Sequence, residues 1–282
     1  MKSLKYISEA FIIYLFFFLG KIIGLKLARQ LFAFVFIKIG PKFKSANTIN
    51  NNLNNILNFN NVEKKEIISK MWANYGKTFI EYIYLKKFKN NIIPTNIKGL
   101  HILESIKKKN KPVIFVSGHF ANFEIMSMEL VKNKINLATI YRPLNNFFLN
   151  PFMEYLRKKY ICPNQIKKGT IGIRQAINFI DRNYSIALMI DQRVSEGENI
   201  KLFDKNALTT TLPAQLALKY NLDIVPIYIS RNDDCFDMEF YNPIKINSHE
   251  TKKDISFKLN KVLEKMILKD PSQWILTHNR WK

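Results

Sequence analysis

The first forty residues carry the longest apolar stretches of the chain. Residues 10–20 are apolar without a charge, and the pattern resumes over residues 22–25 and 31–37 between isolated lysines and arginines. A transmembrane helix needs about 20 apolar residues, roughly twice the first uninterrupted run, so this run spans a bilayer only if flanking lysines reach the interfaces. The second run is basic on one side and aromatic-rich on the other, which favours a helix lying in the interface.

We therefore expect residues 1–40 to form a membrane-anchoring hydrophobic segment. A signal peptide is an open alternative because lysines precede an apolar region of suitable length, although the small-x-small cleavage site is missing. A buried helical hairpin is a second alternative, since short apolar runs also occur in protein cores.

Beyond residue 41 the pattern becomes that of a folded domain. Two helices are expected over residues 42–61 and 62–87, and short apolar runs then alternate with segments of helical periodicity. The expected strands cover residues 113–116, 137–141, 186–190 and 224–229, and the expected helices cover residues 121–132, 147–159, 171–181, 213–220 and 255–268. This alternation predicts an α/β fold with a mostly parallel central sheet flanked by helices. No repeat or Gly/Ser linker divides residues 41–282, so we expect one domain there.

Composition adds a strong positive charge whose meaning is ambiguous. A formal net charge of +22 would ordinarily indicate nucleic acid, an anionic membrane surface or an acidic protein as partner. Lys, Asn and Ile crowd the whole chain, however, as expected from an AT-rich coding sequence. The sequence has no helix-turn-helix, zinc-finger or aromatic-rich strand signature, so no nucleic acid is expected. A non-enzymatic basic protein that binds membranes or nucleic acid remains the alternative from another functional class.

The cysteines offer no site. Cys162 and Cys235 lie far apart and belong to no Cys/His cluster with metal-ligand spacing. We expect free thiols, no metal site and no cofactor.

A histidine and an acid stand where the first strand of the domain is expected to end. The segment Ser117-Gly-His-Phe-Ala-Asn-Phe-Glu124 follows residues 113–116, and ligand crevices usually lie at the carboxyl ends of such strands. If a helix begins near residue 121, Glu124 can fold back toward His119, orient its ring and stabilise its protonated form. This spacing also arises by chance, so spacing alone leaves a helix cap as an alternative.

Further blocks of sequence follow in a fixed order. They are Tyr141-Arg-Pro143 with Asn145, Asp191-Gln192 with Gly197 and Phe203, Thr209-Thr-Thr211 with Pro213, and Pro271-Ser-Gln-Trp274 with His278-Asn-Arg-Trp281. With His119-Phe-Ala-Asn-Phe-Glu124, this order resembles the glycerolipid-type acyltransferases and specifically the late lipid A biosynthesis acyltransferases of the lauroyl/myristoyl type. The chain lacks a Glu-Gly-Thr-Arg block and has Gly118 rather than Asn before the histidine, which favours the lipid A branch over lysophosphatidate acyltransferases.

The resemblance implies an O-acyltransferase with residues 41–282 as its catalytic domain. His119, assisted by Glu124, would act as general base while a hydroxyl of a lipid A precursor attacks the thioester of an acyl carrier protein. Arg142 would bind the acceptor's phosphate or balance charge, and Asp191 would orient Arg142 or another group of the site. An acceptor that is another membrane lipid or glycolipid stays open, because these motifs do not distinguish acceptors.

The resemblance implies a protein of the bacterial inner membrane, in contact with membrane lipids. The basic residues that flank the apolar segment favour a catalytic domain facing the cytoplasm. Trp274 and Trp281 are expected to pack in the core, with the membrane interface as the alternative, and His278 is expected to be structural. His101 and His249 belong to no motif and are expected at the surface.

Overall fold

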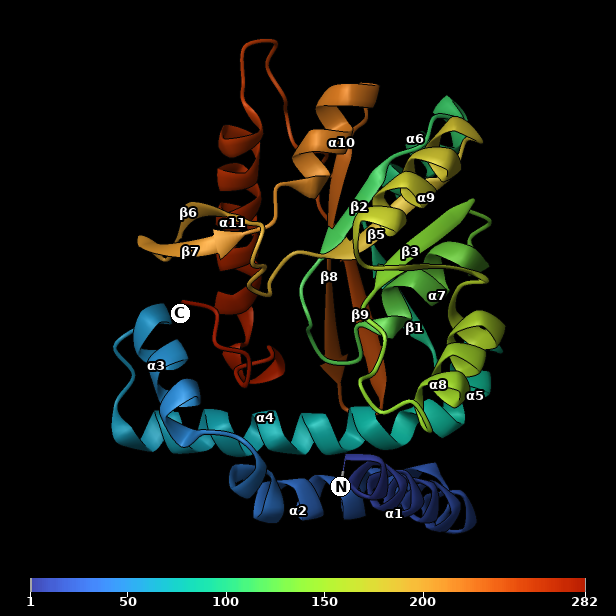
Figure 1. The fold of residues 1–282 in the computed structure, drawn as a ribbon, viewed down its shortest axis with the longest axis vertical. Helices are drawn as coiled ribbons and strands as arrows, with labels where there is room; N and C mark the ends of the chain where they lie inside the picture. The colour runs from blue at the N-terminus through green and yellow to red at the C-terminus, as the bar shows by residue number, and fades with distance from the viewer. Residues whose placement is uncertain (1, 282) are drawn as a thin grey trace.

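A seven-stranded sheet forms the centre of the computed structural model, which describes residues 2–281 (Figure 1). The strand order is β1-β9-β8-β2-β5-β3-β4, and all neighbouring pairs are parallel except β8 and β9. The strands are β1 (Thr95–Lys98), β2 (Ile114–Ser117), β3 (Leu137–Tyr141), β4 (Asn164–Lys167), β5 (Ser185–Met189), β8 (Ile224–Asn232) and β9 (Cys235–Phe240). The predicted α/β fold with a mostly parallel sheet is confirmed.

Helices cover both faces of this sheet, and the side chains of β2 alternate between them. Ile114 and Val116 pack in a core with α9 (Thr170–Asp181), α10 (Leu212–Tyr220) and α11 (Lys252–Lys269). Figure 1 labels these three helices around the sheet. Phe115 packs on the opposite face in a core with α6 (Leu100–Lys109) and α7 (Glu124–Lys132). Burial on both faces explains why the central strands are continuous apolar runs.

The strands missed by the sequence pattern are short and more polar. β1 and β4 lie at the two edges of the sheet. Partly buried and exposed residues alternate along β1, and Ile166 is the one fully buried residue of β4. A separate antiparallel hairpin of β6 (Glu198–Leu202) and β7 (Lys205–Thr209) was likewise not expected. Their weak apolar signal follows from their edge positions, where only part of each strand is buried.

Two predicted helices have different bounds. The helix expected from residue 121 begins at Glu124 as α7, because residues 118–123 form a loop in which Ala121 has a φ of 44°. The helix expected over residues 147–159 is α8 (Asn150–Leu156), which continues into a π-helical turn over Arg157–Ile161.

Four helices open the described part of the chain. They are α1 (Lys2–Ile23), α2 (Leu25–Phe43), α3 (Ala46–Ile56) and α4 (Asn61–Glu81); a 3₁₀ turn (Tyr82–Tyr84) and α5 (Leu85–Lys89) follow. In Figure 1 α4 lies between the first two helices and the sheet. The two helices expected over residues 42–87 thus correspond to α3 and α4.

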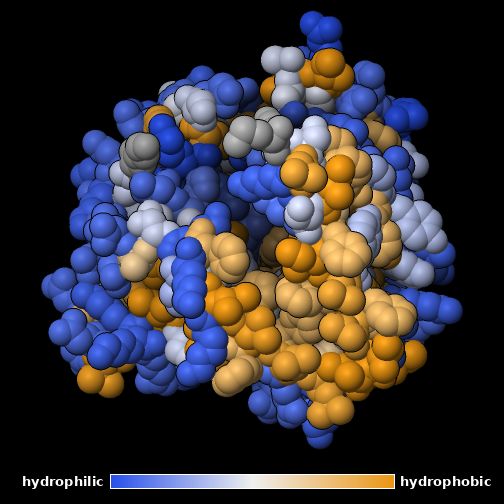
Figure 2. Space-filling model, turned by 60° about the horizontal axis from the view of Figure 1, so that its bottom comes forward, coloured by the Kyte–Doolittle hydropathy of each residue, from blue (hydrophilic) through white to orange (hydrophobic). Residues whose placement is uncertain are grey.

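The first two helices present an apolar face to the outside. Exposed apolar side chains recur at helical spacing on α1 (Leu4, Ile7, Phe11, Leu15, Phe18, Ile22) and on α2 (Leu27, Leu31, Phe34). We call these nine residues the apolar face, and Figure 2 shows how densely apolar side chains gather on this side of the molecule. Ser3–Ile23 is long and apolar enough to cross a membrane, and only 17% of its most apolar window is buried.

Close approach of α2 and α4 depends on a missing side chain. A Cβ atom added to Gly76 would lie 2.0 Å from the carbonyl oxygen of Phe32, so only glycine permits this backbone contact.

Replacing Gly76 with Ala should therefore push α2 and α4 apart. We expect the free energy of unfolding to fall by about 1–3 kcal/mol, the usual cost of overpacking, in denaturant titrations of the detergent-solubilised protein. Lys65→Ala, an exposed change on the same helix, is the control and should change it by less than about 0.5 kcal/mol. Equal stability of the two variants would contradict the close contact.

Candidate active site

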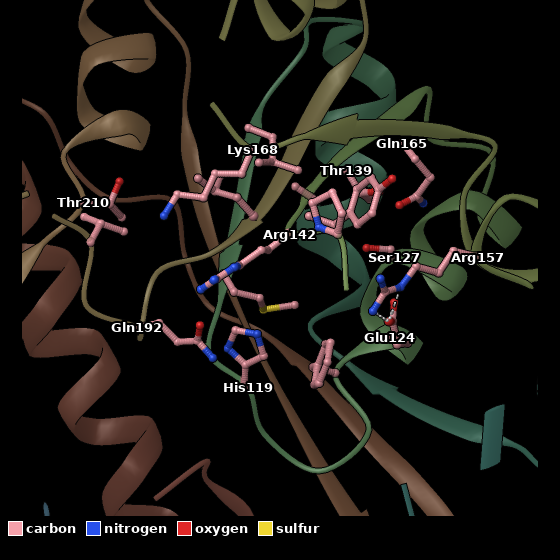
Figure 3. A pocket seen from close by; sticks show the side chains of 18 of the residues that line it. His119, Glu124, Ser127, Thr139, Arg142, Arg157, Gln165, Lys168, Gln192 and Thr210 are labelled. Atoms are coloured by element: carbon pink, nitrogen blue, oxygen red, sulfur yellow. Dashed lines mark hydrogen bonds and ion pairs between the residues drawn. The ribbon is translucent and has the colours of Figure 1, made fainter. Parts of the chain in front are cut away.

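Charged and polar side chains meet at the carboxyl-terminal edge of the sheet. His119 follows β2, Arg142 directly follows β3, Lys168 directly follows β4 and Asp191 follows β5. Because these strands are parallel neighbours, the residues after them converge. A cavity of about 420 Å³ opens there, lined by His119, Arg142 and Lys168 among others (Figure 3).

The carboxylate of Asp191 binds both the imidazole and the backbone of His119. Its Nδ1 lies 2.7 Å from Oδ1 of Asp191, and its backbone N–H donates to Oδ2 at 2.9 Å. The indole Nε1 of Trp274 donates to the same Oδ2, also at 2.9 Å. Three donors thus fix the carboxylate, and the carboxylate fixes the ring.

Asp191 is completely buried, yet it keeps its charge. Burial alone would raise the pKa of its carboxyl, but the charge and hydrogen bonds of His119 and the Trp274 indole hold this pKa below its ordinary value. The imidazole Nδ1 is engaged by this carboxylate, and among residues 2–281 the other ring nitrogen, Nε2, has no hydrogen-bond partner. His119 also lines the cavity, so Nε2 is the nitrogen available to a ligand.

Glu124 does not fold back onto the imidazole. Its Oε1 accepts from Nε of Arg157 and from the hydroxyl of Tyr82, each at 2.7 Å, and Figure 3 shows the carboxylate turned toward Arg157 and apart from the ring. The reason is the later start of α7: the positive φ of Ala121 turns the chain before the helix begins. The position expected of Glu124 beside the ring is occupied by Asp191, although Glu124 still lines the cavity.

Arg157 and Tyr82 were not found by sequence reasoning. Burial would lower the pKa of Arg157, but the Glu124 carboxylate and Tyr82 raise it overall, so the guanidinium stays charged. Tyr82 belongs to an aromatic cluster and Arg157 precedes two lysines, so neither stands in a recognisable motif. The one available signal is residue type, because the chain has eight arginines among its 44 basic residues and arginine suits buried ion pairs better than lysine.

The cavity wall is strongly basic. Arg142, Arg157, Lys168 and Arg193 line it, and Glu124 is the one carboxylate among the lining residues. Arg142 forms no hydrogen bond or ion pair within the described part of the chain. Asp191, which was expected to orient Arg142 or another group of the site, orients the imidazole of His119. An anionic group of a ligand would therefore find unpaired cations here.

The carboxyl-terminal blocks complete the site. Trp274 is buried in the core as expected, and Trp281 is partly buried and donates to the carbonyl of Leu202 at 3.1 Å. His278 lines the cavity, and its Nε2 accepts from the backbone N–H of Arg193 at 2.9 Å. Burial lowers the pKa of His278, which favours the neutral ring that such an acceptor role needs. His101 and His249 are exposed, as expected.

Comparison with protein families identifies the family of this chain. The family described as bacterial lipid A biosynthesis acyltransferase matches residues 1–282, the whole chain. No curated protein matches the chain.

Asp191→Asn should destabilise the protein in a pH-dependent way. An Asn side chain carries no charge in either orientation. Its NH₂ group would face either the two N–H donors now bound to Oδ2 or Nδ1 of His119. We expect a cost of about 1–3 kcal/mol at neutral pH. Because the pKa of the carboxyl is lowered from 3.8 in the folded protein, its stabilisation is present above that value and is lost as the pH falls through the folded pKa.

Unfolding should be followed between neutral pH and about pH 3 for both proteins. The difference in unfolding free energy should shrink toward the acid end. A difference that stays constant with pH would contradict a buried, ionised Asp191.

Proposed function

We propose that this chain, a member of the bacterial lipid A biosynthesis acyltransferase family, moves a fatty acyl chain from the thioester of an acyl carrier protein to a hydroxyl of a lipid A precursor. Membership of the family makes it an O-acyltransferase of lipid A biosynthesis. The donor, the acceptor hydroxyl and the catalytic groups are the proposal. A cofactor has no part in it.

The proposal is carried by one observation, the imidazole of His119 held between a buried carboxylate and a cavity. Asp191 accepts at Nδ1, so Nε2 is the basic nitrogen on the cavity side. A carboxylate at Nδ1 both selects this tautomer and stabilises the imidazolium. These are the properties of a general base for a hydroxyl.

The reaction then needs no covalent enzyme intermediate. Nε2 of His119 removes the proton of the acceptor hydroxyl while the oxygen attacks the thioester carbon. The new C–O bond forms, the C–S bond breaks, and the imidazolium returns the proton to the departing carrier thiolate. Base and acid steps thus use one nitrogen, and a positioned base of this kind typically contributes about 10²–10⁴-fold to the rate.

Glu124 takes part through Arg157 in this proposal. The carboxylate binds Nε of Arg157 at 2.7 Å and so fixes the guanidinium at the cavity wall. Arg142, which has no partner in residues 2–281, is proposed to bind a phosphate of the acceptor, since a guanidinium fork matches phosphate oxygens.

Residues 1–40 are proposed to anchor the protein by lying in the plane of the membrane. The helix α1 is fastened to the rest of the chain along its length: Tyr14 donates to the carbonyl of Phe148 at 3.0 Å, and Asn146 donates to the carbonyl of Tyr6 at 2.8 Å. If α1 crossed the bilayer, it would have to give up these bonds or carry Asn146 and Phe148 into the membrane with it. The exposed rings of Phe147 and Phe148 continue the apolar face next to α1. We therefore propose a catalytic domain at the cytoplasmic side of the inner membrane, with lipids as its partners and without nucleic acid.

Replacement of His119 with Ala should lower acyl transfer from acyl carrier protein by about 10²–10⁴-fold, because the proposed base is lost, while folding and membrane binding persist. The purified variant should be assayed with radiolabelled acyl carrier protein and a lipid A precursor. His101→Ala, which removes an exposed histidine, should transfer at the wild-type rate. Undiminished transfer by the first variant would refute the role of His119.

The same variant identifies the acceptor in cells. A deletion strain should contain a lipid that lacks one acyl chain, restored by the wild-type gene and not by the His119→Ala gene. Mass spectrometry of the lipids reads this directly. Loss of an acyl chain from another glycolipid, with lipid A unchanged, would show that this glycolipid is the acceptor and would contradict lipid A as the acceptor.

The anchor is tested by placing charges on the apolar face. Phe11→Asp with Phe18→Asp should lower partitioning onto vesicles by roughly tenfold or more, since burying one Phe contributes about 1.5–3 kcal/mol. Ile171→Asp, at an equally exposed apolar residue of α9 (71% against 68% for Phe11), is the control and should bind as the wild type does. Equal binding of all proteins would exclude α1 from the anchor.

A further inference from the structure

One buried carboxylate joins the amino-terminal helices, the sheet and the loop that carries the proposed base. Glu81, the last residue of α4, is 0% exposed. Its Oε1 accepts from Nε of Arg29 at 2.7 Å, and both of its oxygens accept from Arg231. Arg29 belongs to α2 and Arg231 to β8, so three separate elements meet at this side chain.

The fourth bond of Glu81 reaches the active-site loop. Nδ2 of Asn122, a residue that is 1% exposed, donates to Oε2 of Glu81 at 2.9 Å. Asn122 lies between His119 and Glu124, inside the loop that turns at Ala121.

The same helix holds this loop at further points. The hydroxyl of Thr78 donates to the carbonyl of Ala121 at 3.2 Å, and the residue after Glu81, Tyr82, binds Glu124. Thr78 and Glu81 lie one helical turn apart on α4, so the end of this helix holds the loop at two points. Glu81 also bonds to Arg29 of α2.

The charges favour a rigid arrangement. Burial would raise the pKa of Glu81, but Arg231, Arg29 and the Asn122 amide hold it below its ordinary value. A buried carboxylate with two guanidinium partners and a third donor has little freedom, since any movement would leave a charge unpaired. The side chain of Asn122 therefore bonds to an acceptor that ion pairs hold in place.

We propose that Glu81 is a positioning residue of the acyltransferase, because it links Arg29 on α2 to Asn122 in the loop. Through this link, the position of the amino-terminal helices determines the geometry of His119 and Glu124. This inference rests on the proposed function of His119. It assigns to Arg29, Glu81 and Asn122 a role that no sequence motif suggested. Glu81 touches neither the cavity nor the reacting groups and acts through the loop.

Three variants of the full-length protein test the link from its two ends. Asn122→Ala removes the loop's donor and leaves both arginines paired with Glu81. Arg29→Gln removes the bond from α2 and leaves Arg231 in place. Asp234→Asn is the matched control, because Asp234 is the second partner of Arg29 but its side chain is 70% exposed, where an ion pair matters little.

We expect Asn122→Ala and Arg29→Gln to lower kcat per folded enzyme by about tenfold to a hundredfold, the usual effect of displaced catalytic groups, with KM changed less than about threefold. The Asp234→Asn enzyme should keep both constants. A purely structural role would lower the melting temperature and leave kcat per folded enzyme unchanged. Either test variant behaving like Asp234→Asn would overturn the proposal.

Hydrogen exchange separates this outcome from failure of the proposed function. Amides of residues 117–126 should exchange faster in Asn122→Ala and in Arg29→Gln than in the wild type or in Asp234→Asn, whether or not the chosen substrates react. Unchanged exchange of this segment in either test variant would overturn the link by itself. If Arg29→Gln does not fold, Arg29→Lys takes its place: one ammonium replaces the guanidinium fork, and faster exchange of the same amides is again expected.

Discussion

The site depends on the burial of one charge, the carboxylate of Asp191, at the end of a central strand. Such a charge is tolerated only with full hydrogen bonding, and it receives the imidazole of His119, the backbone N–H of the same residue and the indole of Trp274. These donors come from the end of β2 and from the carboxyl-terminal segment. The need to satisfy one carboxylate thus brings distant parts of the chain together and fixes the ring orientation that the proposed chemistry uses.

Arginine forms the buried ion pairs with glutamate at the site and beneath it, in a chain whose basic residues are mostly lysine. Arg29, Arg231 and Arg157 pair with buried glutamates, and Arg280, which is 0% exposed, donates to Leu208 and Thr209. A guanidinium offers several directed donors and is less strongly hydrated than an ammonium, so it suits these positions. Most lysines are exposed, although Lys168 lines the cavity.

Sequence reasoning found the parts of the site that depend on local pattern. The apolar runs predicted β2, β3, β5 and β8, and the ends of two of them located His119 and Asp191 at one edge of the sheet. Arg142 was named from the family resemblance. The partner of Glu124 was not predictable in this way. A five-residue spacing suggests a contact with His119, but the turn at Ala121 and the delayed start of α7 are set by packing against α4 and by the bridge of Phe120 to Trp274. The hydrogen bond of Thr78 to Ala121 joins residues 43 positions apart, and the Phe120–Trp274 bridge joins residues much farther apart. The periodicity of the sequence does not indicate such contacts.

The contribution of Trp274 and His278 to the site also has a consequence for biosynthesis. A nascent chain emerges from its amino terminus, so α1 and α2 are available to a bilayer long before the residues that complete the hydrogen bonds of Asp191 have been made. In the interval His119 has no fully formed support, and the carboxylate lacks its indole donor. Under the proposed anchoring by residues 1–40, membrane attachment would therefore precede assembly of the site during synthesis.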